Sequence, residues 1–559
     1  MSLQGIGVST GVAAAPIVKV VPAKSFDPTE PPTTDVESAT AQIKAALANV
    51  GEQLLEAAQK APETSRKVIE ATAQLTGDRG LLKTIVKKLK AGTGRTRAVH
   101  DAIDDYVAKF QKIGGYFAER TTDLIDIRNR TIAELLGVAA PGVPHLTEPT
   151  IIVAEDLAPA DTATMNPNVV VGILTQSGGV TSHTAILAAQ LGIPAAVQVA
   201  GVMELTEGTR VGVDGGSGEV FVDPSLEQIQ ALEAKSAKRT ALLDTFDGPG
   251  ATKDGHKIQL LANIGTAQDA IMVAGEGVEG IGLFRTEFLF LDRQQAPTLE
   301  EQTQTYTRAM REFTGKKFVA RTIDAGADKP LAFANQGTEE NPALGVRGLR
   351  LSMRSEYLLD TQLQALAAAQ AETGAHLWVM APMVGTREEA QWFTDRARQA
   401  GLDMVGIMVE VPAAALRSST LLEVADFASI GTNDLAQYTM AADRLNGSSA
   451  NLLSAWQPAI IELVAHTCAG GTGHTPEPRP VGICGESGGD PLLALVYAGL
   501  GVTSLSMAVR KVPAVRAALA LHDLATCQKM ARAALAAPTA EAARQAVLDL
   551  AAPEMSVIA

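Results

Sequence analysis

The chain of 559 residues carries 47 lysines and arginines against 62 aspartates and glutamates, a formal net charge of −15. This charge argues against nucleic acid and anionic membrane surfaces as partners, because both are bound through positive protein surfaces. The length exceeds a single hydrophobic core, and 46% hydrophobic with 19% charged residues is typical of a globular protein of several domains.

The N-terminus and the cysteines predict a cytoplasmic protein. The opening MSLQGIGVSTGVAAAPIVKV has no basic segment before its apolar run and no long apolar span, so we expect neither a signal peptide nor a membrane anchor. The three cysteines, Cys468, Cys484 and Cys527, lack CxxC spacing, which is typical of a reducing compartment.

The first part of the chain predicts an α/β domain interrupted by helices. Residues 1–21 alternate glycine with β-branched residues and predict one or two strands. Residues 22–143 follow a 3.6-residue period and predict an all-helical domain. Short apolar runs return over 144–222, so we expect 1–21 and 144–222 to form one discontinuous domain around the helical insertion.

The second part predicts a linker helix over 223–248 and a (β/α)₈ barrel over 249–559. Eight short apolar runs alternate with helical patterns, as in a parallel sheet. These runs are 258–265, 280–288, 317–326, 377–384, 405–412, 427–434, 480–487 and 503–508. In such a barrel the C-terminal ends of the strands form the active face. The polar or reactive residues at those ends are Asn263, Arg285, Thr286, Arg321, Asp324, Glu410, Asn433, Asp434, Cys484 and Glu486.

His183 stands out from the other histidines by its context, GGVTSHTAI. A glycine turn followed by a helix N-terminus favours anions and disfavours imidazolium, so this ring is expected to stay neutral and able to accept a phosphoryl group. Thr181 and Ser182 suit either helix capping or contact with phosphoryl oxygens. The seven other histidines are expected to be structural or surface residues.

The barrel residues suggest a site for an anion and a cation. Arg285 and Arg321 can pair with phosphate or carboxylate, and Glu410 and Asp434 are hard donors suited to Mg²⁺. Cys484 can exchange a proton with a substrate, although packing explains a strand-end thiol equally well. Arg444, just beyond these acids, suits either an anion contact or a surface ion pair.

Several motifs together resemble Enzyme I of the phosphoenolpyruvate-dependent sugar phosphotransferase system, and the resemblance runs essentially end to end. They are GGVTSHTAI, GLFRTEFLFLDR, NPALGVRGLR, VEVPAAA, SIGTNDLAQYTMAADR and GICGESGGD. The resemblance implies a phosphoryl relay from phosphoenolpyruvate (PEP) through His183 to the histidine-containing phosphocarrier protein HPr, with release of pyruvate. It also implies a swivelling histidine domain, a helical domain that docks HPr, and a homodimer formed through the barrel.

The resemblance assigns roles position by position. Arg285 and Arg321 would clamp the phosphate of PEP, with Asn433 and Arg444 also touching the substrate. Glu410 and Asp434 would hold Mg²⁺, and Cys484 would protonate the enolate carbon. Thr162 would lie near the histidine, and Lys329 and Arg347 match further positions of the pocket. The chain departs from the family at Leu445 and Gln198, where glycine is usual, and around Ala327 in IDAGADK.

Two other functions fit part of the pattern. A pyruvate phosphate dikinase or PEP synthase shares the histidine domain and the barrel but needs a large nucleotide-binding domain, and the chain has no GxxxxGK[ST] loop. A non-catalytic scaffold that binds a carrier protein would not need His183, the clamp arginines, the metal acids and Cys484 together. ATP turnover during pyruvate and PEP exchange would favour the first alternative.

Overall fold

The computed structural model divides the chain into two units, Met1–Glu233 and Ala234–Ala559, with the division inside one helix, α9 (Leu226–Asp244). It describes residues 2–21, 26–60, 69–70, 72–113, 121–138, 141–143, 146–157, 165, 169–178, 183–291, 293–326, 331–334, 337, 339–443, 449, 452–474 and 477–558. Within those ranges, no helix combines the length and the apolar content that crossing a lipid bilayer requires.

The first unit contains an eight-stranded mixed sheet in the order β1-β8-β7-β3-β4-β5-β6-β2. Its strands are β1 (Ser2–Gln4), β2 (Ile6–Ser9), β3 (Val12–Lys19), β4 (Thr150–Ala154), β5 (Val170–Thr175), β6 (Ala195–Val197), β7 (Arg210–Asp214) and β8 (Glu219–Val222). β3, β4, β5 and β6 run parallel to one another, and Ile17 faces Ile151 across the first of these pairs. The two sides of the helical segment therefore meet in one sheet.

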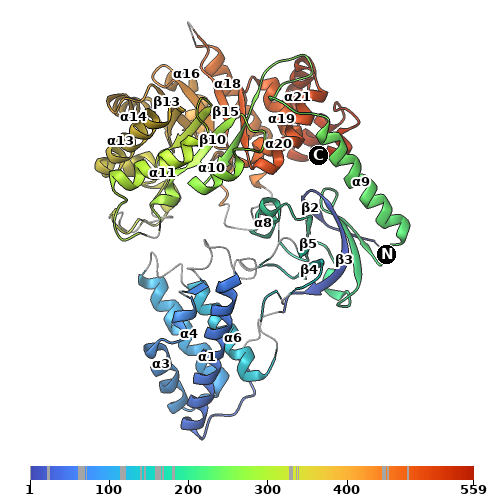
Figure 1. The fold of residues 1–559 in the computed structure, drawn as a ribbon, viewed down its shortest axis with the longest axis vertical. Coiled ribbons are helices and arrows are strands. Elements are labelled where there is room, and N and C mark those ends of the chain that lie inside the picture. The colour runs from blue at the N-terminus through green and yellow to red at the C-terminus, as the bar shows by residue number, and fades with distance from the viewer. Residues whose placement is uncertain are drawn as a thin grey trace. The chain divides into compact units, whose positions relative to one another are not determined.

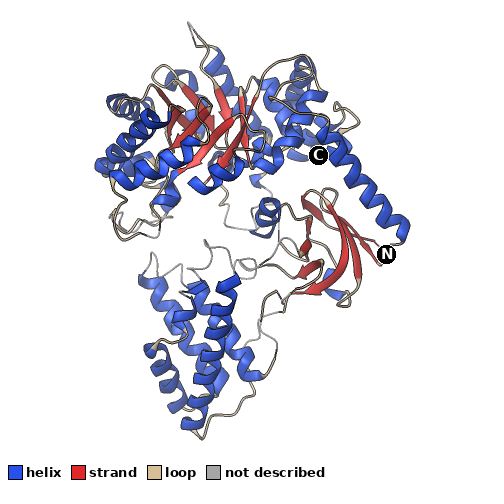
Figure 2. Cartoon of the chain, viewed as in Figure 1, coloured by secondary structure: helices blue, strands red, loops and turns tan. Residues whose placement is uncertain are grey.

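The segment between β3 and β4 is helical, as Figure 2 shows. Its described helices are α1 (Val36–Lys60), α3 (Arg79–Lys90), α4 (Arg95–Ile113) and α6 (Thr121–Leu136). They share a core of small and branched apolar residues that includes Ile43, Ile85 and Ile127, each fully buried. The apolar pattern over 66–92 is broken at Asp78, whose carboxylate accepts a hydrogen bond from the Leu81 amide and caps α3.

The second unit is built around a closed barrel of eight parallel strands (Figure 1). The strands are β9 (Gln259–Ile264), β10 (Gly280–Arg285), β11 (Lys317–Arg321), β12 (His376–Ala381), β13 (Met404–Val409), β14 (Phe427–Ile430), β15 (Val481–Ile483) and β16 (Ser504–Met507). β16 pairs with β9 and closes the ring. Each strand matches one of the eight apolar runs, because barrel strands are covered on both faces and read as nearly continuous apolar segments.

Helices cover the outside of this barrel. The α-helices of the second unit after α9 are α10 (Ala267–Val273), α11 (Leu299–Arg311), α12 (Leu349–Arg354), α13 (Glu356–Thr373), α14 (Arg387–Gln399), α15 (Pro412–Leu416), α16 (Ser418–Leu421), α17 (Thr432–Met440), α18 (Pro458–Thr472), α19 (Pro491–Leu500), α20 (Val512–Leu521), α21 (Leu524–Ala536), α22 (Ala540–Leu548) and α23 (Met555–Ile558). α10, α11 and α14 begin with reciprocal capping boxes at Thr266, Thr298 and Thr386.

The fold class expected from the sequence is confirmed. The first unit has the mixed α/β sheet with its helical insertion, and the second unit has the (β/α)₈ barrel. Helix α9 lies within the segment expected to be a linker helix. The domain boundaries expected from the sequence stay predictions.

Close packing inside the barrel predicts that Gly282 in β10 tolerates no side chain. A Cβ added there would overlap the Cβ of Ser506 and lie 3.0 Å from the Cβ of Leu261. We expect Gly282→Ala to lower the free energy of unfolding by about 1–3 kcal/mol. Urea denaturation followed by tryptophan fluorescence measures this directly, because all three tryptophans lie in the second unit.

The matched control is Gly275→Ala, where an added Cβ meets no atom within 4 Å. It should leave the urea midpoint unchanged. Equal midpoints for the two variants would contradict the packing argument.

Candidate functional site

Charged and reactive side chains from neighbouring strands meet at one end of the barrel. Arg285 is the last residue of β10, and Arg321 is the last residue of β11. Glu410 directly follows β13, Asp434 lies in the first turn of α17, and Cys484 directly follows β15. These are C-terminal strand ends, the face on which (β/α)₈ barrels carry their active sites.

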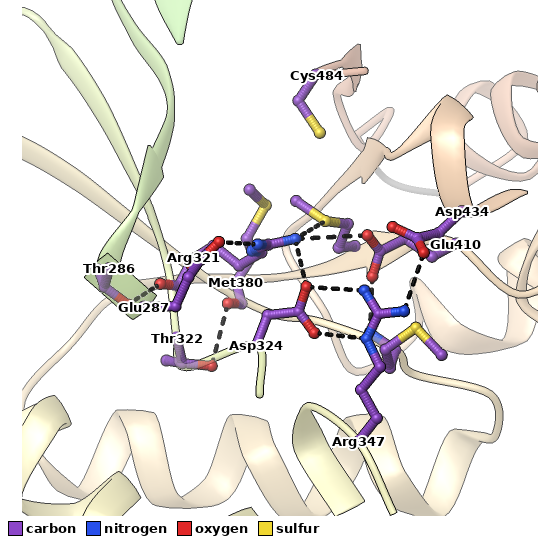
Figure 3. Close-up of polar contacts among 12 residues, drawn as sticks. Thr286, Glu287, Arg321, Thr322, Asp324, Arg347, Met380, Glu410, Asp434 and Cys484 are labelled. Atoms are coloured by element: carbon purple, nitrogen blue, oxygen red, sulfur yellow. Dashed lines mark hydrogen bonds and ion pairs between the residues drawn. The ribbon is translucent and has the colours of Figure 1, made fainter. Parts of the chain in front are cut away.

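Asp324 joins two arginines at this end of the barrel (Figure 3). Its Oδ1 lies 3.1 Å from Nε of Arg347 and its Oδ2 lies 3.1 Å from Nη2 of the same guanidinium, which makes a two-pronged pair. Its Oδ2 also lies 3.0 Å from Nη1 of Arg321. Such forked, charge-assisted pairs fix the plane of a guanidinium as well as its position.

The remaining acids bind the outer nitrogens of the same two arginines. Nη2 of Arg321 lies 2.7 Å from Oε1 of Glu287, and its Nη1 lies 3.5 Å from Oε1 of Glu410. Nη1 of Arg347 lies 3.0 Å from Oδ1 of Asp434. Two cations and four carboxylates therefore form one connected cluster, which we call the arginine–carboxylate cluster.

The arginine–carboxylate cluster is buried, and burial sets its electrostatics. Arg347 is 2% exposed and Glu410 is 1% exposed. Burial alone would lower the pKa of both guanidinium groups, but the surrounding carboxylates, Asp324 first, raise it above the usual value. Burial, and then the negative charges of Asp434 and Asp324, raise the pKa of Glu410 to about 8. Glu410 therefore holds a proton more readily than an exposed carboxyl group does.

Glu410 and Asp434 can supply oxygen ligands to a hard cation. One oxygen of Glu410, Oε2, accepts a hydrogen bond of 3.0 Å from the Met383 amide, which fixes the carboxylate. Oε2 of Glu287 is buried and has no hydrogen-bond partner among the described residues. The described part of the chain holds no group of three or more histidine, cysteine or acidic side chains arranged for a metal. A cation at this place would take two carboxylates and complete its shell with water or substrate.

Cys484 lies beside the cluster as a buried thiol. Its Sγ is 3.5 Å from the carbonyl oxygen of Ile430, and it is 2% exposed. Burial raises the pKa of this thiol to about 11, so it carries its proton at neutral pH. The amide of Asn263 donates to the Cys484 carbonyl at 3.1 Å and holds the backbone there.

The segment that carries His183 belongs to the first unit. His183 is the first described residue of α8 (His183–Leu191), so it belongs to a helix, as expected from GGVTSHTAI. Residues 179–182 and the side chain of His183 lie outside the described parts. Gln198, one of the departures from the family, has φ 55°, the left-handed region that favours glycine, and its Nε2 donates to the Gly178 carbonyl at 2.9 Å.

Several expected site residues are not placed in the cluster. Thr162, Lys329 and Arg444 lie outside the described residues, as do Ala327 and Leu445. Asn433 is described in the first turn of α17 and is exposed.

Two members of the cluster had no assigned role in the sequence analysis. Glu287 was not among the candidates, although it lies only two residues after Arg285 in GLFRTEF. The sequence placed Asp324 at the end of a strand but predicted no partner for it. In both cases the sequence has an acidic residue two or three positions after an arginine at the end of a strand, and this spacing could have identified them.

The chain is similar to PEP-utilising enzymes along most of its length. Residues 240–524 match the family described as "PEP-utilising enzyme, PEP-binding domain", residues 146–218 match the mobile domain of these enzymes, and residues 4–120 match their N-terminal domain.

Three relatives that match most of the chain share one name. A phosphoenolpyruvate-protein phosphotransferase of Streptomyces coelicolor is 47% identical over 559 residues, covering 98% of this chain and 99% of that protein. The protein of the same name from Haloferax volcanii is 40% identical over 87% of each chain. That of Listeria monocytogenes is 35% identical over 96% of this chain and 97% of its own length.

Because the carboxylate of Asp324 pairs with two buried arginines, we predict that it contributes strongly to the stability of the protein. Asp324→Ala removes a counter-charge from two buried guanidinium groups at once, so we expect a loss of about 3–5 kcal/mol in the free energy of unfolding. Asp360→Ala is the control, because that half-exposed carboxylate forms an ion pair with Arg396 near the surface and should cost less than about 1 kcal/mol. Tryptophan-monitored urea curves compare the two, and similar losses would contradict the assignment.

Because all three cysteines are buried, we predict that their thiols react slowly with thiol reagents in the native protein. Burial raises the pKa of Cys468 and Cys527 to about 12 and that of Cys484 to about 11, so less than about one thiol in a thousand is ionised at pH 7.5. A disulfide reagent should therefore titrate fewer than one thiol quickly in the native protein and all three in urea. A fast native reaction of one equivalent that Cys484→Ala removes would show that Cys484 is a thiolate.

Proposed function

The chain belongs to the phosphoenolpyruvate-protein phosphotransferase family of PEP-utilising enzymes, and from this membership we propose that it transfers a phosphoryl group from PEP to His183 and then to HPr. The reaction releases pyruvate and begins the phosphorylation chain of a sugar phosphotransferase system. The observation that carries the proposal is the arginine–carboxylate cluster, in which arginines suited to an anion lie beside carboxylates suited to a cation.

PEP binds through its phosphate and carboxylate to arginine side chains. Arg285 and Arg321 hold the phosphate, and Arg347 keeps Asp324 and Asp434 in place around it. The buried Nε of Arg321 has no partner among the described residues and offers one donor to the substrate. Asn433, Lys329 and Arg444 complete the contacts, as the resemblance to the family implies.

Glu410 and Asp434 hold Mg²⁺. Their oxygens fit this ion, because Mg²⁺ is bound in proteins by one or two carboxylates, with water and substrate phosphate in its other positions. Burial, and then the charges of Asp434 and Asp324, raise the pKa of Glu410, and a cation held between these acids would reduce their mutual repulsion. When bound, Mg²⁺ neutralises negative charge that develops on the phosphate and on the enolate oxygen.

Cys484 supplies the proton that completes the PEP half-reaction. Transfer of the phosphoryl group leaves the enolate of pyruvate, and protonation of its methylene carbon gives pyruvate. A thiol with a pKa of about 11 keeps its proton until that basic carbon forms. Asn263 holds the Cys484 backbone, so the thiol needs little rearrangement during the step.

His183 carries the phosphoryl group between the two partners. The N-terminus of a helix favours the phosphorylated and neutral forms of an imidazole over imidazolium, and His183 is the first described residue of α8. Thr162 lies beside it according to the resemblance. The α/β domain of 1–21 and 144–222 moves His183 between PEP in the barrel of 249–559 and HPr on the helical domain of 22–143.

Membership of this family also suggests an oligomeric state and a cellular location. We propose a homodimer through the barrel and a cytoplasmic location, which the three unpaired cysteines support. The relatives match the chain over nearly their whole lengths, so neither a dikinase nor a scaffold is favoured.

Separate half-reactions test the function. With PEP labelled in its phosphate and Mg²⁺, the wild type should form an acid-labile phosphohistidine that added HPr removes. His183→Ala should abolish labelling, whereas His376→Ala, an exposed histidine at the start of β12, should label normally. Cys484→Ala should slow labelling by PEP about 100-fold or more and leave transfer to HPr largely unchanged.

The outcomes separate the candidate functions. Absence of any label on the wild type would favour the non-catalytic scaffold. A label that only a nucleotide removes would indicate a dikinase. Equal damage to both half-reactions in Cys484→Ala would contradict its role as proton donor.

A further inference from the structure

A fully buried amide lies behind the arginine–carboxylate cluster, on the outer layer of the barrel. Gln362 belongs to α13 and has no exposed surface. Its Oε1 accepts a hydrogen bond of 2.9 Å from the Ile323 amide. Its Nε2 donates to the Thr286 hydroxyl at 2.9 Å and to the Tyr306 hydroxyl at 3.0 Å.

This amide holds both sides of a short backbone segment. Thr286, one of its partners, donates from its hydroxyl to the Arg321 carbonyl at 2.7 Å. The other contact is with the Ile323 amide, directly before Asp324. Thr322, between these two points, donates its own amide to the Met380 carbonyl at 3.0 Å. The segment 321–324 is therefore fixed at consecutive backbone positions, and Arg321 and Asp324, at its ends, belong to the cluster (Figure 3).

The direction of each hydrogen bond in this network is determined. The Tyr306 hydroxyl receives a proton from Gln362 and donates its own to Oε1 of Gln302, whose Nε2 donates to the Pro297 carbonyl. Thr286 in turn must donate to the Arg321 carbonyl. Position 362 therefore needs one acceptor and two donors at the same time. An amide provides them, whereas a carboxylate lacks the donors and an apolar side chain lacks both.

We propose that Gln362 is a positioning residue that sets the affinity of the barrel for PEP by fixing segment 321–324, without touching the substrate. The inference rests on the proposed function, because it assigns PEP to Arg321. Loss of the amide frees the backbone that carries Arg321 and Asp324, and small displacements of substrate-binding groups are expensive. Tyr306 is bonded to the same amide, but its hydroxyl donates to Gln302 and not to segment 321–324, so its removal should not affect the binding of PEP.

Four substitutions test this in the full-length chain. Gln362→Met removes all three hydrogen bonds at nearly constant volume. Thr286→Val removes the hydrogen bond to the Arg321 carbonyl and the one accepted from Gln362, and leaves the contact of Gln362 with the Ile323 amide. Tyr306→Phe is the matched control, since it deletes a buried hydroxyl of the same network away from the site. Thr286→Ser keeps the hydroxyl and tests rescue. Each is combined with His183→Ala so that calorimetry measures binding of PEP in the presence of Mg²⁺ without turnover.

We expect the dissociation constant of PEP to rise about tenfold in Gln362→Met and in Thr286→Val, and to stay within twofold in Tyr306→Phe and Thr286→Ser. Combining Gln362→Met with Thr286→Val should add little to either alone, because both loosen the same backbone segment, 321–324. The urea midpoint should fall in both Gln362→Met and Tyr306→Phe, whereas only Gln362→Met should lose affinity for PEP. The two variants therefore distinguish an effect on affinity from an effect on stability. In otherwise unchanged enzyme, KM for PEP should rise more than kcat falls.

Three results would overturn the inference. Affinity for PEP that stays within twofold in Thr286→Val shows that the link to the Arg321 carbonyl does not matter, even where Gln362→Met fails to fold. A loss of affinity in Tyr306→Phe equal to that in Gln362→Met shows a general effect of stability. No heat of PEP binding in the His183→Ala parent overturns the proposed function itself, and this inference with it.

Discussion

The shared ion pair of Asp324 with Arg321 and Arg347 is the constraint on which the barrel mouth depends. Moving a charged group out of water costs several kcal/mol per ion, so each buried arginine needs a close and well-oriented counter-charge. The carboxylate oxygens of Asp324 lie 3.0 to 3.1 Å from guanidinium nitrogens of both arginines. The paired arginines in turn allow Glu410 and Asp434 to approach each other despite their like charges. Two arginines and four carboxylates can thus occupy one small, buried space.

The surrounding scaffold fixes this cluster through the backbone. Barrel closure brings the strand ends together, and hydrogen bonds from backbone and side-chain amides then hold the residues that follow the strands. Met383 holds Glu410 through its amide, Asn263 holds the Cys484 carbonyl, and Gln362 holds the segment between Arg321 and Asp324. Such a mouth favours catalysis by alignment and charge neutralisation, since the groups are in place before substrate arrives.

The fold could be predicted because each element has a local signature. Apolar runs such as VGIMVEVP and FASIGTND predicted their strands to within a few residues, since a barrel strand is covered on both faces. A helix was expected after GGVTS, and the described helix α8 contains His183. The strand-end residues Arg321, Glu410 and Cys484 were identified for the same reason, because a parallel barrel presents all its strand ends at one face.

The network around those residues could not be predicted, because its partners are distant in sequence. Glu287 and Arg321 are separated by 34 residues, Ile323 and Gln362 by 39, and Arg347 and Asp434 by 87. Local patterns of polarity thus determined the elements, the barrel and the face that carries the chemistry. The tertiary structure alone decided which acid meets which arginine and which amide holds the loop, because those pairings exist only after the strands close and exclude water.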